Sequence, residues 1–142
     1  MGYREALRDS KRAPSKEDLE EILGPARYRR FEMVYDEIID MDLLAQIKWS
    51  KLDGSWFHAF FYEKEYLFGI KWGPDFFYTQ MEVDADLCLW LQKNDQLSND
   101  SREILLKNRN QAKGGATVEA NLEHPKEQEA FFDLLSLVLS RS

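Results

Sequence analysis

The sequence is poor in the residues that cross-link chains, bind metals and perform acid–base catalysis. Its 142 residues include one cysteine, Cys88, so no disulfide can form within the chain. They include two histidines, His58 and His124. The carboxylate pairs at 84/86 and 63/65 lie two residues apart, but this spacing is common on solvated turns and is not specific for a metal. We therefore expect neither a metal site nor a cofactor, and we assign no catalytic residue from the sequence.

Long apolar segments are also absent. No apolar run reaches the roughly 20 residues that a membrane-spanning helix needs. Residues 1–14 are too polar to contain the apolar core of a secretory signal. The hydrophobic fraction of 44% and the charged fraction of 32% are ordinary for a globular protein. These observations predict a cytoplasmic protein that makes no contact with a membrane.

Positive charge is in the minority. The chain has 19 lysines and arginines against 26 acidic residues, which gives a net charge of −7. Because clustered basic side chains bind phosphate backbones, this acidic balance argues against a nucleic-acid partner. The best basic group consists of Arg27, Arg29 and Arg30, and we interpret it as the solvated face of a helix.

The motifs of nucleotide-binding and hydrolytic enzymes are missing as well. Residues 113–115 (KGG) lack the upstream glycine and the serine or threonine of a phosphate-binding loop, so we interpret them as a turn. Cys88 lies in an apolar stretch, where a thiol usually packs as a small hydrophobic side chain. An enzyme would have to be centred on His58, which lies among aromatic residues.

The length of the chain is that of one domain. No internal repeat, linker or shift in composition divides it. We interpret residues 14–142 as a single α+β domain that follows a flexible N-terminal arm, residues 1–13, which is too polar to order itself.

Capping signals predict where several helices begin. Ser15 with Asp18 resembles a capping box, and a glycine and a proline at 24–25 end the first helix and begin a second over about 26–40. Residues 85–93 follow a good N-cap but also alternate at period two, so a helix and a continued strand both remain open. Asp100 with Glu103 predicts a helix to about residue 111, and His124 precedes the last helix.

Between the early and late helices, apolar residues recur at every second position, which is typical of strands. The predicted strands are 45–50, 55–62, 66–72, 76–83 and 116–122, with turns at 51–54, 63–65 and 73–75. Connections this short require antiparallel neighbours. We therefore predict an α+β fold with an antiparallel sheet of about five strands. It comprises a four-strand meander and one late strand, with helices packed mainly on one face.

Aromatic residues are in excess, because nine Phe, six Tyr and four Trp make up 13% of the chain. Four rings point to one side of residues 55–62, those of Trp56, His58, Phe60 and Tyr62. The other side carries Phe57, Ala59 and Phe61. One face of residues 66–72 is predicted to carry Tyr66, Phe68, Ile70 and Trp72.

Neither face of these strands is polar, although an antiparallel sheet with one wet face should alternate between apolar and polar residues. Both faces therefore need a cover, since a soluble protein rarely exposes a large apolar patch. The cover is the remaining helices, a second copy of the chain, or a ligand held in a pocket.

Our leading hypothesis is a binding domain for a small apolar or aromatic ligand. Tryptophan, tyrosine and histidine combine apolar area with a polar group, which suits a pocket that orients its ligand. The predicted ligand-binding residues are Trp49, Trp56, His58, Phe60, Tyr66 and Trp72. The first alternative is a homodimer or partner-binding module that uses the same sheet face. The second is an enzyme centred on His58.

The order of these segments resembles that of a known family. The segments that carry the resemblance are 6–9 (ALRD), 14–19 (PSKEDL), 22–24 (ILG), 54–56 (GSW), 76–77 (FF), 97–98 (LS) and 114–115 (GG). Over nearly the whole chain they resemble the bacterial domain-of-unknown-function family numbered three-seven-eight-eight. The resemblance implies a compact cytoplasmic α+β domain with no established activity and no catalytic residues to transfer. Residues 116–118 (ATV) depart from it, because an aromatic residue is expected there.

Overall fold

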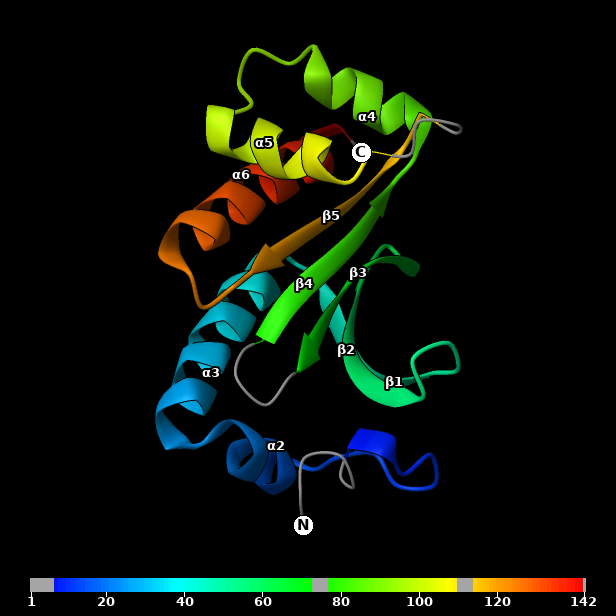
Figure 1. Cartoon of the computed structure of the whole chain (residues 1–142), viewed down its shortest axis with the longest axis vertical. Helices are drawn as coiled ribbons and strands as arrows, with labels where there is room; N and C mark the ends of the chain where they lie inside the picture. Colours follow the sequence, from blue (N-terminus) through cyan, green and yellow to red (C-terminus); the bar gives the residue numbers. More distant parts are fainter. Residues whose placement is uncertain (1–6, 73–76, 110–113, 142) are drawn as a thin grey trace. The chain divides into compact units, whose positions relative to one another are not determined.

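The structure, a computed structural model, describes residues 7–72, 77–109 and 114–141. It is 46% helical and 29% strand, and five strands form an antiparallel sheet in the order β1-β2-β3-β4-β5 (Figure 1). The predicted α+β fold, with a four-strand meander and one late strand, is confirmed. The chain divides into two compact units, Met1–Tyr78 and Thr79–Ser142, which are described in turn.

The elements of the first unit lie close to their predicted boundaries. They are α2 (Lys16–Leu23), α3 (Pro25–Ile39), β1 (Leu44–Ser50), β2 (Ser55–Tyr62) and β3 (Glu65–Trp72). β4 (Phe77–Val83) begins in this unit and ends in the second. The predicted turn at 73–75 and the predicted first residue of the fourth strand, Phe76, lie outside the described residues.

Local signals fix both ends of α2. The Ser15 hydroxyl accepts a hydrogen bond from the Asp18 amide at 3.1 Å, and the Asp18 carboxylate accepts one from the Ser15 amide at 2.8 Å. The predicted capping box is therefore confirmed, and the bond from the Ser15 amide holds the pKa of Asp18 below its usual value. Gly24 ends the helix with a φ of 83°, and Pro25 begins α3.

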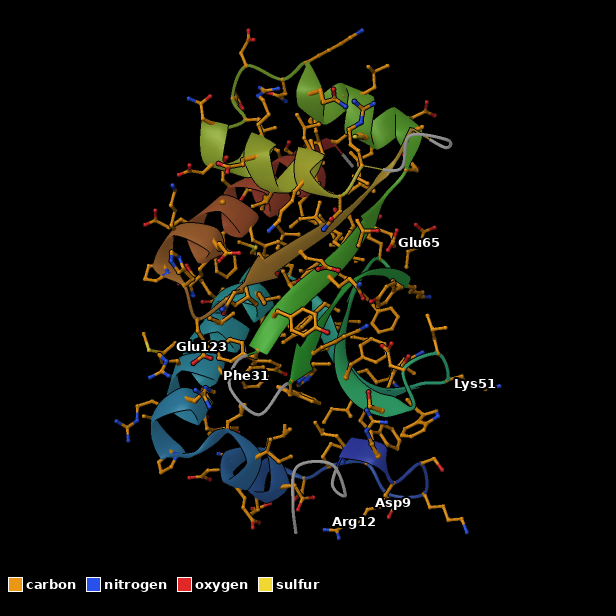
Figure 2. The ribbon with its side chains drawn as sticks, viewed as in Figure 1. Asp9, Arg12, Phe31, Lys51, Glu65 and Glu123 are labelled. Atoms are coloured by element: carbon orange, nitrogen blue, oxygen red, sulfur yellow. The ribbon has the colours of Figure 1, made fainter. Side chains whose placement is uncertain are left out.

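One face of α3 packs on the sheet. Its buried side chains are Tyr28, Phe31, Val34 and Ile38, which recur at the helical period. The ring centroid of Phe31, which Figure 2 labels on α3, lies 5.9 Å from that of His58 on β2 and 6.0 Å from that of Trp72 on β3. This helix therefore covers the sheet face that carries His58 and Trp72.

A β-bulge places Tyr66 on the opposite face, so the predicted face for this residue is wrong. Phe60 pairs with Phe68, but the next residue, Phe61, pairs with Tyr66, which leaves Leu67 as an extra residue in β3. Because side chains alternate along a strand, the extra residue turns Tyr66 away from Phe68. It lies instead beside Phe61, with ring centroids 5.9 Å apart.

The described part of the predicted arm makes contacts with later residues of the first unit, and one is an ion pair of 3.5 Å between Arg12 and the Asp18 carboxylate. Leu7 is buried, and the indole N–H of Trp56 donates a hydrogen bond of 2.7 Å to the backbone oxygen of Asp9 (Figure 2). The first six residues of the arm lie outside the described part of the chain. Residues 7–9 are therefore tied to β2 by one hydrogen bond, and Leu7 is a buried apolar side chain of the same segment.

The second unit continues β4 and adds three helices and the late strand within its described residues. These are α4 (Ala85–Gln92), α5 (Asn99–Lys107), β5 (Ala116–Asn121) and α6 (Pro125–Arg141). The ambiguity over residues 85–93 is resolved as a helix, because the Asp84 carboxylate accepts a bond of 2.8 Å from the Leu87 amide. Of the predicted turn at 113–115, the two glycines belong to the described residues and the lysine does not.

The predicted start of α5 is wrong by two residues. The N-cap is Ser98, whose hydroxyl accepts a hydrogen bond of 3.1 Å from the Ser101 amide. The Asp133 carboxylate on α6 accepts bonds from the Ser98 amide and the Ser101 hydroxyl, at 3.1 and 2.8 Å. This contact from a distant helix holds Ser98 as the cap, and Asp100 lies in the first turn.

Gly115 allows the chain to pass close to the end of β4. A Cβ atom at this position would collide with the backbone carbonyl oxygen of Val83 and would lie 3.5 Å from the Asp84 Cα atom. A backbone oxygen cannot rotate aside as a side chain can, so only glycine fits without a shift of the strand.

We predict that Gly115→Ala lowers the free energy of unfolding by about 1–3 kcal/mol, because the added methyl group overpacks the junction. Gly54→Asn is the matched control, since a Cβ there meets nothing within 4 Å and asparagine tolerates the φ of 62°. Urea denaturation of both variants measures the difference. An unchanged stability for Gly115→Ala would contradict the close approach.

Candidate functional site

A cavity of about 250 Å³ opens in the first unit, where residues of α2, α3, β1 and β2 meet. Its lining is mostly apolar and aromatic, with a charged group at three positions. The residues that line it are Lys16, Leu19, Tyr28, Phe31, Glu32, Tyr35, Asp36, Ile47 and His58. Two other hollows in the described residues, of about 460 Å³ beside Thr117 and about 220 Å³ beside Ile104, have no aromatic lining, and a third, of about 400 Å³, has one aromatic residue, Phe61.

The aromatic wall of the cavity comes from one face of α3. Tyr28, Phe31 and Tyr35 lie three and four residues apart, which places them on the same side of the helix. The Phe31 ring centroid (Figure 2) lies 6.2 Å from that of Tyr28 and 6.2 Å from that of Tyr35, with tilted planes. On the sheet side, Ile47 of β1 is the cross-strand partner of His58 on β2.

His58 is the buried polar residue of this cavity. It is 9% exposed, and its ring lies 5.1 Å from that of Tyr35 and 5.4 Å from that of Phe60, with which it stacks. Among the described residues, its Nδ1 atom has no hydrogen-bond partner. Burial lowers the pKa of His58 to about 4, so the imidazole is neutral at neutral pH.

Because no described residue bonds to Nδ1, nothing there fixes which ring nitrogen carries the proton. In most buried histidines, a hydrogen bond to one nitrogen sets the role of the other. A neutral imidazole has one donor and one acceptor nitrogen, and Nδ1 of His58 is buried without a partner among the described residues.

Charged groups lie at the α2 and α3 side of the cavity. Lys16 and Glu32 form an ion pair with 4.0 Å between Nζ and Oε2, and Asp36 lies one helical turn beyond Glu32. Burial raises the pKa of Tyr28, and the negative charges of Glu32, Glu20 and Glu17 raise it further. The carboxylates of this region therefore make the potential at the Tyr28 phenol negative.

Of the six predicted ligand-binding residues, His58 alone lines this cavity. Phe60 and Trp72 are buried, and Trp72 meets the His58 ring edge-on at 5.6 Å. Trp49 and Trp56 pack against each other at 5.5 Å. Tyr66 lies on the opposite face and is 51% exposed.

Sequence reasoning missed the three rings of α3, because their helical spacing predicted a packed core face. The signal that was present is the position of Tyr35 next to Val34. Val34 is buried, whereas Tyr35 is half-buried and lines the cavity. Adjacent residues of a helix point in different directions, so beside the buried Val34 the ring of Tyr35 stands at the margin of the core.

The other reactive side chains considered in the sequence, Cys88 and His124, lie in positions typical of structural residues. Cys88 is buried in α4, with the Gln92 amide nitrogen 3.2 Å from its sulfur. His124 is exposed at the start of α6. The residues that the structure describes contain no group of three or more metal-ligating side chains, and none of their helices is long and apolar enough to cross a membrane.

Comparisons with family models, with curated proteins and with solved structures found no match to the chain. The resemblance drawn from the sequence motifs stays a prediction.

We predict that the buried imidazole makes stability depend on pH. In the unfolded chain a histidine binds a proton below about pH 6.5, whereas in the folded chain His58 binds one only below about pH 4. Stability should therefore be complete above pH 6.5 and fall as the pH is lowered towards 4, by about 3 kcal/mol.

Denaturation curves of the protein and of His58→Gln between pH 4 and pH 7 measure this contribution. The difference between the two should change with pH over this range, because the glutamine does not titrate. His124→Gln is the matched control, since His124 is exposed. A pH dependence that is the same in all three proteins would show that His58 is not buried as described.

Proposed function

We propose that this chain is a non-catalytic binding domain that takes a small, largely apolar ligand into the cavity beside His58. The supporting observation is the cavity lining, which combines aromatic rings with a neutral imidazole whose Nδ1 has no partner among the described residues. Ligand sites typically have this composition, with many apolar side chains and a few polar groups. The volume of about 250 Å³ suits a ligand of about one ring.

The cost of burying His58 also favours a binding role. An unpaired buried polar group costs about 1–3 kcal/mol, which a phenylalanine at this position would avoid. A ligand that donates to or accepts from the imidazole would recover part of this cost. The aromatic neighbours Tyr35 and Phe60 hold the ring in place for such a contact.

Binding is better supported than catalysis. A general base works best when its pKa lies near the working pH, whereas burial lowers the pKa of His58 to about 4. A catalytic histidine is usually oriented by a hydrogen bond from a third group, and within the described part of the chain its Nδ1 has none.

The proposal is tested by filling the cavity. Ile47 lies opposite His58 and lines the cavity, so Ile47→Phe should occupy the space that a ligand needs. Gln46→Phe is the matched control, because the neighbouring residue of a strand points to the other face.

A panel of small aromatic and aliphatic compounds is screened by thermal shift, with tryptophan fluorescence as the second readout. Trp72 reports on the site because its ring lies 5.6 Å from that of His58. A compound present at about 100 times its dissociation constant should stabilise the protein by about 3 kcal/mol. The shift should vanish in Ile47→Phe and persist in Gln46→Phe. If no compound shifts the protein, or if Ile47→Phe responds equally, the proposed function is wrong.

A second candidate function rests on the opposite face of β2 and β3. Tyr66 lies 6.3 Å from Phe57 between ring centroids, and the Lys48 ammonium stands 5.1 Å above the Phe61 ring. Leu44 on β1 is 68% exposed. Exposed aromatic side chains with a charged margin are typical of protein interfaces. We therefore propose this face as the surface of a homodimer or of another protein contact.

Sedimentation velocity from low to high micromolar concentration tests the homodimer. We expect the sedimentation coefficient to rise with concentration and Leu44→Lys to reduce the rise, because it places a charge on the apolar face. Glu63→Lys is the control. It makes the charge of the chain two units more positive, one more than Leu44→Lys does, but at an exposed turn. A monomer at every concentration would exclude the homodimer.

A further inference from the structure

We propose that the cavity beside His58 selects a small organic cation, namely an ammonium group carried on a short apolar or aromatic body. This inference rests on the proposed function, because it names the class of ligand that the same cavity takes. Three features of the lining carry it: the aromatic rings of α3, the excess of carboxylates over lysine, and the absence of a charge on the imidazole.

The first feature is the set of rings from Tyr28, Phe31 and Tyr35. A cation within about 6 Å of a ring centroid is attracted by the negative face of the ring, and partial desolvation strengthens the attraction. The Phe31 plane is tilted by 37° from that of Tyr28 and by 40° from that of Tyr35, so the rings are not stacked face to face. All three line the cavity.

The second feature is the charge of the lining. Glu32 and Asp36 face one cation, Lys16, whose Nζ atom already lies 4.0 Å from the Glu32 carboxylate. The lining therefore has a net negative charge. Burial raises the pKa of Tyr28, and the negative charges of Glu32, Glu20 and Glu17 raise it further, so these carboxylates disfavour an anion at this wall. The same field favours a cation.

The third feature is the neutral state of His58. A protonated imidazole would repel a cation in the same cavity, but burial lowers the pKa of His58 to about 4, so the ring is uncharged at neutral pH. A neutral imidazole also has an acceptor nitrogen, which an ammonium N–H can use.

Other ligand classes fit the lining less well. An anion would meet two carboxylates and a lysine that is already paired. A neutral ligand would gain the apolar contact but nothing from the negative potential. The cavity is thus better matched to a positive charge than to either alternative.

The test compares three compounds that share one ring and differ in charge. Isothermal titration of the full chain at pH 7 and low salt uses benzylammonium, benzyl alcohol and benzoate. We expect benzylammonium to bind about tenfold more tightly than benzyl alcohol, and benzoate to bind most weakly. Added salt should weaken the binding of benzylammonium alone, because salt screens the attraction to the carboxylates.

Matched variants identify the charge that matters. Asp36→Asn should weaken benzylammonium about three- to tenfold and leave benzyl alcohol unchanged. Glu37→Gln makes the same change of charge on the same helix, but Glu37 does not line the cavity, so its effect should be less than about twofold. Circular dichroism confirms that both variants are folded.

The outcomes separate this inference from the proposed function. If benzyl alcohol or benzoate binds as tightly as benzylammonium and Ile47→Phe abolishes that binding, the cation preference is overturned and the binding site stands. If Glu37→Gln weakens benzylammonium as much as Asp36→Asn does, the carboxylate of the lining is not the cause and the inference fails. If none of the three probes binds, the inference fails, and the wider compound screen decides the proposed function.

Discussion

The packing of Phe31 against the sheet is the interaction on which the first unit depends. Its ring meets the rings of Tyr28 and Tyr35 on its own helix and those of His58, Trp72 and Phe77 on three strands, at 5.4 to 6.2 Å. Removing a buried phenylalanine side chain typically costs about 3–5 kcal/mol. Because this ring sets the position of α3 over β2 and β3, it also sets the space that remains beside Ile47, which is the cavity.

His58 is the residue at which the proposed function and local stability diverge. Its neighbours on the same sheet face are aromatic rings. Among the described residues, Nδ1 of its imidazole is buried without a hydrogen-bond partner, and so is the indole nitrogen of the neighbouring Trp72. Local rules of protein stability are most often broken at functional sites. The cost is acceptable because the ring is neutral and packed between Tyr35 and Phe60. A neutral imidazole in a lining that also holds two carboxylates is the property on which the proposed preference for a cation rests.

The predictions from sequence were correct where the deciding contacts are local. The capping box of Ser15 and Asp18 was found because both partners lie within one helical turn. The start of α5 was not, because Asp133, far along the chain, stabilises Ser98 as the cap. Similarly, Tyr66 was assigned to the wrong face, since the bulge at Leu67 depends on the pairing of β3 with β2. The alternation of residues within a single strand does not show where a bulge will form.

The sequence by itself determined the order of the elements, the meander and the abundance of aromatic residues on both sheet faces. These follow from periods of two and 3.6 residues, which neighbouring positions encode. The tertiary structure alone decided that α3 covers the face of His58, that Tyr66 lies on the other, and that Tyr28 and Tyr35 border a cavity. The reason is that strand register and helix docking depend on shape and contacts between residues that are distant in the chain.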